Sequence, residues 1–377
     1  MAPLRVDCID SLDRLRAIAP AWDRLWEASE VTLPTVRAEA VAQWIEHFAP
    51  NARQHTLVVW HGHDLVGALP LVGRRVRALL PVGDLPSNCW STSGELLLDP
   101  ATDAQAVMDL LASALGQMPW PLLWLDYVPI EAARWQGLIR ALAEHRFLVD
   151  CHPRYRIAQT QLPPDFNEYL AGRSKNLRRS LHKDQRRLEQ TGRLALRRRA
   201  VVLPNQVEPC LREVFEVEQR SWKRRSGQTV LDTPGMFAFY CRLAEQLAHW
   251  GYLHLAVLEF NGTPIAAELG WTAKGVYHSF KVAYDQSYRQ YGPGQLLRKA
   301  LLEQLHADRA AEVVDFQGPM TAALASWSTR SYPIGRIVIA TRRLEGRLAF
   351  GAYRALAATV RLLCKMARLS GAAARSS

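Results

Sequence analysis

The chain has 377 residues, which is too long for one ordinary domain, so about two domains are expected. Hydrophobic residues make up 49% and charged residues 22% of the sequence, a composition typical of soluble globular proteins with sizeable cores. The formal net charge of +11 favours an anionic partner, such as a phosphorylated cofactor, a nucleic acid or an anionic membrane surface.

The distribution of residue types argues against three other kinds of protein. The six cysteines are scattered without a Cys-x-x-Cys pair, so neither a zinc site nor a disulfide framework is expected. Residues 1–15 carry acids and have no apolar core, so we expect no secretory signal. No apolar stretch approaches the roughly 18 residues that a spanning helix needs. We therefore expect a cytoplasmic protein.

The first half of the chain predicts helices around one hairpin. A helix is predicted over 11–29, because Ser11 precedes apolar residues at helical spacing. Residues 55–75 contain two apolar runs around a polar turn, which predicts an antiparallel hairpin. Two more helices are predicted over 103–118 and 131–145.

The second half repeats the hairpin. A strand is predicted over 154–163, followed by a very basic segment and a helix over 207–222. Residues 252–280 form two apolar runs around Asn261–Gly262, the strongest short hairpin signal, and continue through Lys274–Gly275 into a third strand. Two such hairpins in one chain suggest a duplicated domain.

A glycine-rich loop joins the third strand to a predicted helix over 294–307. Gly292 and Gly294 let the backbone approach a ligand closely, and the helix start supplies unpaired N–H groups and a positive dipole end. These features favour a site for a pyrophosphate, although Pro293 removes one donor. A tight strand-to-helix loop without a ligand is the alternative interpretation.

The loop has the pattern Arg-x-x-Gly-x-Gly, which resembles the acetyl-CoA pyrophosphate loop of the GNAT acyltransferase superfamily. More widely, the chain is similar to GNAT-like proteins linked to cellulose and other exopolysaccharide biosynthesis, which are related to the Fem-type peptidoglycan aminoacyltransferases. The similarity extends over about residues 20 to 335 and includes "WDRLWEAS", "LVGALPL" and "SKNLRRSLHKDQRRLEQTG".

This resemblance implies an α/β (α+β) fold of two tandem GNAT-like domains, each a mixed, mainly antiparallel sheet flanked by helices. The expected domains are 1–155 and 156–340, followed by a basic amphipathic helix over 341–377. The first half has no Gly-x-Gly before a helix, so we expect it to lack a cofactor site.

The expected co-substrate is acetyl-CoA or another acyl-CoA. Gly292 and Gly294 would seat its pyrophosphate with help from Arg289. The neighbouring loop residues complete the expected cofactor-binding set: Gln290, Tyr291 and Gln295. No metal is expected, because no histidine near these segments has a Cys or Asp partner at ligand spacing.

Acyl transfer needs a group that takes a proton from the nucleophile, and three carboxylates are candidates. Glu268 lies in a strand, Asp285 ends the strand before the loop, and Asp315 lies in the strand after the helix. Each has a structural alternative, as an exposed strand residue or a loop cap. Candidate substrate contacts, with solvated or buried structural roles as alternatives, are Lys281, Tyr284 and Trp327.

One departure from the family pattern concerns the acceptor. The family often carries a Tyr–Lys pair after the strand that holds Asp315, whereas this chain has "MTAALASW" and retains only Trp327. The contact with the acceptor that depends on the pair is therefore in doubt.

Two basic regions stand out. Between Arg173 and Arg199 there are eleven Lys or Arg residues against two acids and no aromatic residue. This segment is either a solvated helix face or a surface for an anionic glycan, an acyl carrier protein or tRNA; stacking on single-stranded nucleic acid is not indicated. In the tail, arginines repeat every seven residues on one helical stripe that either packs on the protein or lies on an anionic membrane: Arg347, Arg354, Arg361 and Arg368.

Together these features predict an enzyme, a GNAT-type acyltransferase that moves an acetyl or other acyl group from CoA to an amine or hydroxyl. The expected acceptor is a sugar in exopolysaccharide or cell-envelope biosynthesis, and the expected location is cytoplasmic or peripheral at the inner membrane. Nucleic acid is not expected as a partner. Two alternatives remain: a Fem-like transferase that uses aminoacyl-tRNA, and a degenerate, non-catalytic GNAT assembly factor.

Overall fold

The structure, a computed structural model, describes residues 3–76, 78–199 and 203–373 and consists of two compact units. The first unit contains Met1–Val31, Val36–Arg154 and Ile334–Ser377, and the second contains Thr32–Thr35 and Tyr155–Pro333. Residues 334–340 belong to the first unit, whereas the sequence placed them in the second domain. The reason is that the last strand, β14, pairs antiparallel with β7 from Gly335↔Val128 to Ala340↔Leu122.

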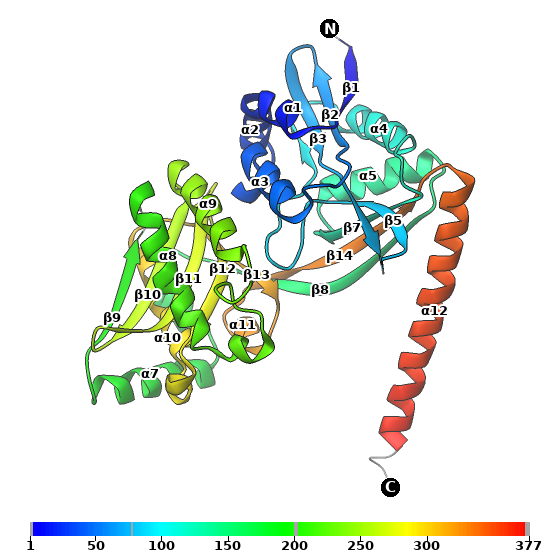
Figure 1. Cartoon of the computed structure of the whole chain (residues 1–377). Helices are drawn as coiled ribbons and strands as arrows, with labels where there is room; N and C mark the ends of the chain where they lie inside the picture. The colour runs from blue at the N-terminus through cyan, green and yellow to red at the C-terminus, as the bar shows by residue number, and fades with distance from the viewer. Residues whose placement is uncertain (1–2, 77, 200–202, 374–377) are drawn as a thin grey trace. The chain divides into compact units, whose positions relative to one another are not determined.

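The first unit is a mixed α/β structure. One sheet has the order β1 (Leu4–Ile9), β2 (Thr56–His61), β3 (Asp64–Leu69) and β6 (Leu97–Leu98). The other strands follow the order β4 (Val72–Val76), β5 (Leu80–Asp84), β7 (Leu122–Val128), β14 (Arg330–Ala340) and β8 (Val149–Gln161), of which β8 and β14 also have residues in the second unit. The helices are α1 (Leu12–Ala17), α2 (Ala19–Ala28), α3 (Ala38–Phe48), α4 (Ala104–Leu115), α5 (Ala133–Glu144) and α12 (Leu344–Ala373) (Figure 1). A 3₁₀ turn, η1 (Pro34–Val36), has residues in both units.

The elements of this unit follow local sequence signals. Ser11 caps α1 and Asp103 caps α4, each through its side-chain oxygen. The helix predicted over 11–29 is two helices that meet at Ile18, because Pro20 stands in the first turn of the second one. The predicted hairpin is confirmed, with β2 and β3 antiparallel on either side of a turn at Gly62.

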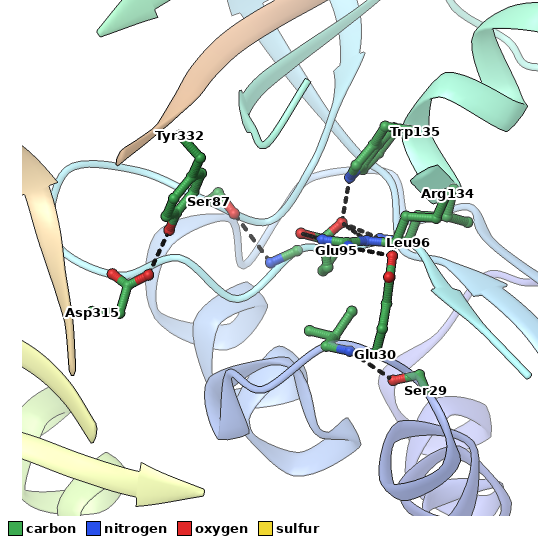
Figure 2. Close-up of polar contacts among 11 residues, drawn as sticks. Ser29, Glu30, Ser87, Glu95, Leu96, Arg134, Trp135, Asp315 and Tyr332 are labelled. Carbon is green, nitrogen blue, oxygen red and sulfur yellow. Dashed lines mark hydrogen bonds and ion pairs between the residues drawn. The ribbon is translucent and has the colours of Figure 1, made fainter. Parts of the chain in front are cut away.

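A buried carboxylate connects three segments of the first unit. Glu95 accepts hydrogen bonds from Arg134 Nη2 at 2.9 Å and from Trp135 Nε1 at 2.5 Å, while Arg134 Nη1 also contacts Glu30 at 2.7 Å (Figure 2). Glu95 and Trp135 are buried, and the negative charge of Glu95 is compensated by the guanidinium of Arg134 and the indole N–H of Trp135. We therefore interpret these contacts as a structural network.

The second unit is built on a sheet of order β8-β13-β12-β11-β10-β9. Its remaining strands are β9 (Leu194–Arg199), β10 (Leu253–Phe260), β11 (Thr263–Ala273), β12 (Val276–Tyr284) and β13 (Val313–Pro319). Its helices are α6 (Phe166–Ala171), α7 (Lys175–Glu189), α8 (Pro204–Gln219), α9 (Met236–His249), α10 (Pro293–Ala307) and α11 (Ala322–Ala325), with 3₁₀ segments η2 (Trp222–Ser226) and η3 (Gln286–Tyr291).

The predicted meander of the second unit is confirmed. Strands β10, β11 and β12 pair antiparallel in chain order. The first turn has φ of 50° at Asn261 and 78° at Gly262, and the second has 49° at Lys274 and 73° at Gly275. An Asn–Gly step tolerates this left-handed backbone, which is why it marks a hairpin in a sequence.

Helix α10 connects β12 to the parallel strand β13 and packs on the meander. Its buried residues Leu297, Leu301 and Leu305 form a core cluster with residues of β10 and β11, including Leu258 and Ala266. Helix α8 contacts the same strands and β12. A mixed, mainly antiparallel sheet flanked by helices is the fold class that the sequence predicted.

Candidate functional site

A pocket lies where β12 and β13 separate. The two strands pair in parallel from Val276↔Val313 to His278↔Asp315, and Phe280 is an extra residue in the pairing of β12 with β11. Beyond this ladder a pocket of about 500 Å³ is lined by the end of β12, the glycine loop, the start of α10 and residues after β13. The sequence had placed the cofactor loop and the strand ends at this location, and the structure brings them together.

The glycine loop ends in a residue with left-handed backbone. Gly292 has φ of 55° and is the N-cap of α10, and Pro293 follows at the first helical position. The N–H of Gln295 donates to the carbonyl of Gly292 at 2.8 Å, and the N–H of Leu296 donates to the same oxygen at 3.1 Å. Pro293 has no N–H, so Gly294 is the first-turn residue left to offer an amide to a ligand.

Side chains at the two glycines would reduce the space in the loop. A Cβ at Gly294 would lie 3.4 Å from Cδ1 of Tyr284, whose ring lines the pocket. A Cβ at Gly292 would lie 3.4 Å from Oδ2 of Asp184 in α7, and φ of 55° would strain it in addition. The pocket entrance is therefore shaped by the absence of side chains at these positions.

The pocket lining carries cations and no carboxylate: Lys223, Arg289 and Arg298. Lys223 pairs with the buried Glu218 at 2.9 Å, and Arg289 is exposed in the loop. Arg298 donates from Nη1 to Oε1 of Gln295 at 3.2 Å and lies over the ring of Phe316. Its buried Nε has no hydrogen-bond partner among the described residues. This excess of positive charge suits a phosphorylated ligand.

Glu268 lies behind the pocket, in β11, and is only 1% exposed. It accepts a hydrogen bond from the hydroxyl of Tyr277 at 2.9 Å. Burial raises the pKa of its carboxyl group, against the charge of Arg298 and hydrogen bonds from Ser279 and Tyr277. Because Ser279 lines the pocket and Glu268 does not, a proton from a bound nucleophile would reach Glu268 through the hydroxyl of Ser279.

Glu268→Gln is expected to change how stability depends on pH. Since burial raises the folded-state pKa of Glu268, the carboxyl group stabilises the fold fully below about pH 4.5, its ordinary value, and less as the pH rises through the folded-state pKa. The free energy of unfolding of Glu268→Gln relative to the natural protein should therefore increase with pH above 4.5. Urea unfolding from pH 4 to 8 measures this, and a pH-independent difference would contradict the assignment of the raised pKa.

Asp285 occupies the position of a helix cap. Its Oδ1 accepts from the N–H of Ser287 at 2.9 Å and from the hydroxyl of Ser287 at 2.6 Å, and its Oδ2 accepts from Arg220 Nε at 2.8 Å. Burial acts to raise the pKa of Asp285, but these hydrogen bonds outweigh it and the pKa is lowered. The carboxylate caps the start of η3 and stabilises the loop.

Asp315 is the centre of a hydrogen-bonded network. Its Oδ2 accepts from Gln159 Nε2 at 2.6 Å and from the Tyr332 hydroxyl at 2.8 Å, the latter visible in Figure 2. Its Oδ1 accepts from both the N–H and Nε2 of Gln317 at 2.9 Å, and the same Nε2 lies 3.0 Å from Nδ1 of His278. Burial lowers the pKa of His278, which favours a neutral ring with Nδ1 as the acceptor.

The remaining predicted residues have different surroundings. Tyr284 lines the pocket, whereas Lys281 lies over the rings of Tyr240 and Phe280 and is not part of the lining. Trp327 is fully buried and donates from Nε1 to Oε1 of Gln295 at 2.6 Å. Its contact with the pocket is therefore indirect, through Gln295.

Two of the predicted loop residues do not line the pocket. Gln290 is exposed and does not line the pocket, and Tyr291 lies under the guanidinium of Arg187 from α7. Sequence reasoning missed Ser279 and Arg298. Polar residues within the apolar pattern of a strand and of a helix were the available signal.

Comparison with known proteins supports this interpretation of the fold. Residues 175–322 match the family model described as an acetyltransferase (GNAT) domain, and that range contains the whole loop and every residue that lines the pocket except Ala323 and Leu324. A search of curated proteins found no match.

Several solved structures resemble most of the chain. A crystal structure of FemX has a TM-score of 0.58 at 10% identity and covers 89% of this chain and 96% of that one. The C-terminal domain of a putative lysylphosphatidylglycerol synthetase from Agrobacterium fabrum has a TM-score of 0.54 at 13% identity, covering 92% and 98%. A conserved protein of unknown function from Bacteroides thetaiotaomicron has a TM-score of 0.52 at 12% identity, covering 91% and 100%.

These likenesses concern the fold. Residues 175–322 match a GNAT domain model, and the solved structures share the fold over most of the chain, in agreement with the predicted α/β class of mixed sheets flanked by helices. Within the described part of the chain, no group of three or more His, Cys, Asp or Glu residues is arranged to hold a metal ion.

Proposed function

We propose that the second unit transfers an acetyl or other acyl group from CoA to an amine or hydroxyl acceptor. The observation that carries this proposal is the pocket between β12 and β13, with the glycine loop at one side and cations in its lining. A pyrophosphate at Gly294 would lie at the positive end of α10, with Arg289 from the same loop beside it. The pantetheine arm would extend into the pocket along β12, past Val282 and Ala283.

The chemistry requires few groups from the protein. The acceptor attacks the thioester carbonyl, and its proton leaves through Ser279 towards Glu268, whose raised pKa suits a general base. Arg298 is placed to stabilise negative charge on the carbonyl oxygen, since its buried Nε has no partner among the described residues. In this assignment Asp285 and Asp315 position the loop and the strand end rather than transfer protons.

The acceptor that we propose is a sugar in exopolysaccharide or cell-envelope biosynthesis, on the strength of the resemblance of the sequence to that family. A thiol-release assay with acetyl-CoA tests it, with glucosamine as the amine acceptor and N-acetylglucosamine as the hydroxyl acceptor. We expect release of CoA thiol that depends on one of these sugars. Release that is the same without any acceptor, at saturating acetyl-CoA, would contradict the proposal.

We propose that the first unit has lost its cofactor site. It has parallel strands β5 and β7, as the second unit has β12 and β13, but its sequence holds no Gly-x-Gly before a helix. The side chain of Trp120 fills the space beside β5, because a Cβ at Gly83 would lie 2.3 Å from Cε3 of its ring. Acyl-CoA is therefore assigned to the second unit alone.

We further propose that α12 attaches the protein to an anionic membrane surface. None of the described helices is both long and apolar enough to cross a membrane. The start of α12 packs on the first unit through Phe350 and Tyr353, while Leu348 and Leu356 are exposed beside Arg347 and Arg354. Exposed apolar and basic residues on one helix are typical of helices that lie in a membrane interface. The side chains of Arg361 and Arg368 lie outside the described residues.

Removal of residues 358–377 is expected to lower binding to anionic vesicles. The segment carries four Lys or Arg residues and no acid, and each cation near an anionic surface contributes about 1 kcal/mol. The cut follows Ala357 because Phe350 and Tyr353 belong to the core of the first unit. Vesicle flotation measures the effect, and salt should reproduce it by screening.

Two results would contradict the membrane assignment. One is equal flotation of the full-length and truncated proteins, and the other is no flotation of either. The control is Arg361→Gln with Lys365→Gln and Arg368→Gln, which keeps the length of the helix and should also reduce flotation. Acetyl-CoA affinity should stay within about threefold, since the tail belongs to the first unit and the pocket to the second.

A further inference from the structure

Helix α7 presents a broad cationic face to solvent. Leu177, Leu181 and Leu188 are buried, and the opposite side of the helix is exposed. That side carries six cations, with His182 among them: Lys175, Arg178, Arg179, Lys183, Arg186 and Arg187. From Lys175 to Arg187 the helix rises about 18 Å at 1.5 Å per residue.

The positive charge of this face is not neutralised by ion pairs within the described part of the chain. None of the six cations forms an ion pair with another described residue, whereas Arg197 in the next strand pairs with both Glu213 and Glu259. Cations in the first turns also oppose the helix dipole, and α7 has no acidic residue in its first turn. A helix selected for stability alone would not have this arrangement, so an anionic partner is indicated.

Helix α7 lies next to the proposed cofactor loop (Figure 1). Helix α7 contacts both η3 and α10. Oδ2 of Asp184 is 3.4 Å from the position of a Cβ at Gly292, and the guanidinium of Arg187 is 5.0 Å from the ring centroid of Tyr291. A partner bound to α7 therefore stands where the phosphate end of a phosphopantetheine arm would leave the pocket.

The size and chemistry of the face select among anionic partners. The nucleotide of CoA carries one phosphate beyond its pyrophosphate, which is too little charge for six cations over about 18 Å. No large hydrophobic side chain on α7 is exposed, which disfavours base stacking and membrane insertion. A protein surface of repeated carboxylates fits a straight cationic helix of this length.

We propose that α7 docks an acidic carrier protein that delivers the acyl group as a thioester on a phosphopantetheine arm. The inference rests on the proposed function, because the arm would enter the same pocket as that of CoA. In the transfer, the bond between the acyl carbon and the arm's sulfur breaks and a bond to the acceptor nitrogen or oxygen forms. The acceptor's proton ends on the released thiol.

Binding measurements test this without knowledge of the acceptor. The probes are an acetylated acyl carrier protein, acetyl-CoA, an RNA duplex and phosphatidylserine vesicles. The variant is Lys175→Gln with Arg178→Gln and Arg179→Gln, residues about 7.5 to 13.5 Å along the helix from Asp184 and so distant from a nucleotide at the loop. These changes remove cations from a helix start, so the variant should fold with an unchanged or higher Tm.

We expect the variant to bind the carrier protein roughly tenfold more weakly and acetyl-CoA within about threefold of the natural protein. The matched control removes two cations from α12 and one from the residue before it, through Arg347→Gln, Arg354→Gln and Arg343→Gln, and should leave carrier binding unchanged. Equal binding of the carrier by the natural protein and the α7 variant would overturn the inference. So would α7-dependent binding of the RNA or the vesicles without binding of the carrier.

The same measurements separate this inference from the proposed function. Binding of acetyl-CoA without binding of the carrier overturns the inference and leaves the function in place. Binding of neither probe, with the protein folded, contradicts the proposed function as well.

Discussion

Gly294→Val is expected to weaken acetyl-CoA binding by about 1 to 3 kcal/mol, or roughly 5- to 150-fold in Kd, the cost of losing hydrogen bonds to a charged group. Gly294 is the first-turn residue whose amide remains available, since Pro293 has none and the N–H of Gln295 is used by Gly292. A valine there would place its methyl groups between that amide and the pocket, beside the ring of Tyr284. Calorimetric titration with acetyl-CoA measures the loss.

The matched control for this variant is Gly351→Val. A Cβ at Gly351 would meet no atom within 4 Å, and the residue lies in α12, in the other unit. It introduces the same side chain into a helix and should leave the Kd unchanged. An unchanged Kd for a folded Gly294→Val protein would contradict the assignment of the loop to the pyrophosphate.

Trp327→Ala is expected to destabilise the protein by about 3 to 5 kcal/mol, the usual effect of removing a large buried aromatic side chain. Trp327 is fully buried, stacks with Tyr169 at 6.4 Å between ring centroids and donates to Gln295. The same change also removes one of the two hydrogen bonds that Oε1 of Gln295 accepts at the pocket wall, and the one from Arg298 remains. Urea unfolding measures the change in the free energy of unfolding.

Trp327→Phe separates packing from hydrogen bonding. It retains an aromatic ring and loses the indole donor, so its cost should be clearly smaller than that of alanine. If Trp327 were instead a direct contact for the substrate, alanine would weaken ligand binding and leave the stability nearly unchanged. That outcome would show that the buried position assigned to the ring is incorrect.

Local signals in the sequence were sufficient to predict the meander and the glycine loop. The Asn261–Gly262 step specifies a hairpin because its backbone requirement is met by those two residues alone. Gly292 and Pro293 likewise specify the end of one element and the start of the next. Such rules depend on neighbours in the chain, so a single sequence reveals them.

Features that depend on contacts between residues far apart in the chain could not be predicted from local signals. The sequence could not show that Asp315 would be surrounded by Gln159 and Tyr332, which are 156 and 17 residues away in the chain. It also could not show that Arg298 would line the pocket while Lys281 would lie against aromatic rings. The pairing of β14 with β7, which places the end of β14 in the first unit, also depends on residues far apart in the chain.

The most direct test of the central claim is a crystal structure of the protein with acetyl-CoA. We expect density for the pyrophosphate at Gly292–Gly294 and for the pantetheine arm between β12 and β13, with the thioester carbonyl near Ser279 and Arg298. We expect no CoA in the first unit. Density for acetyl-CoA elsewhere, or an empty pocket in crystals grown at saturating acetyl-CoA, would contradict it.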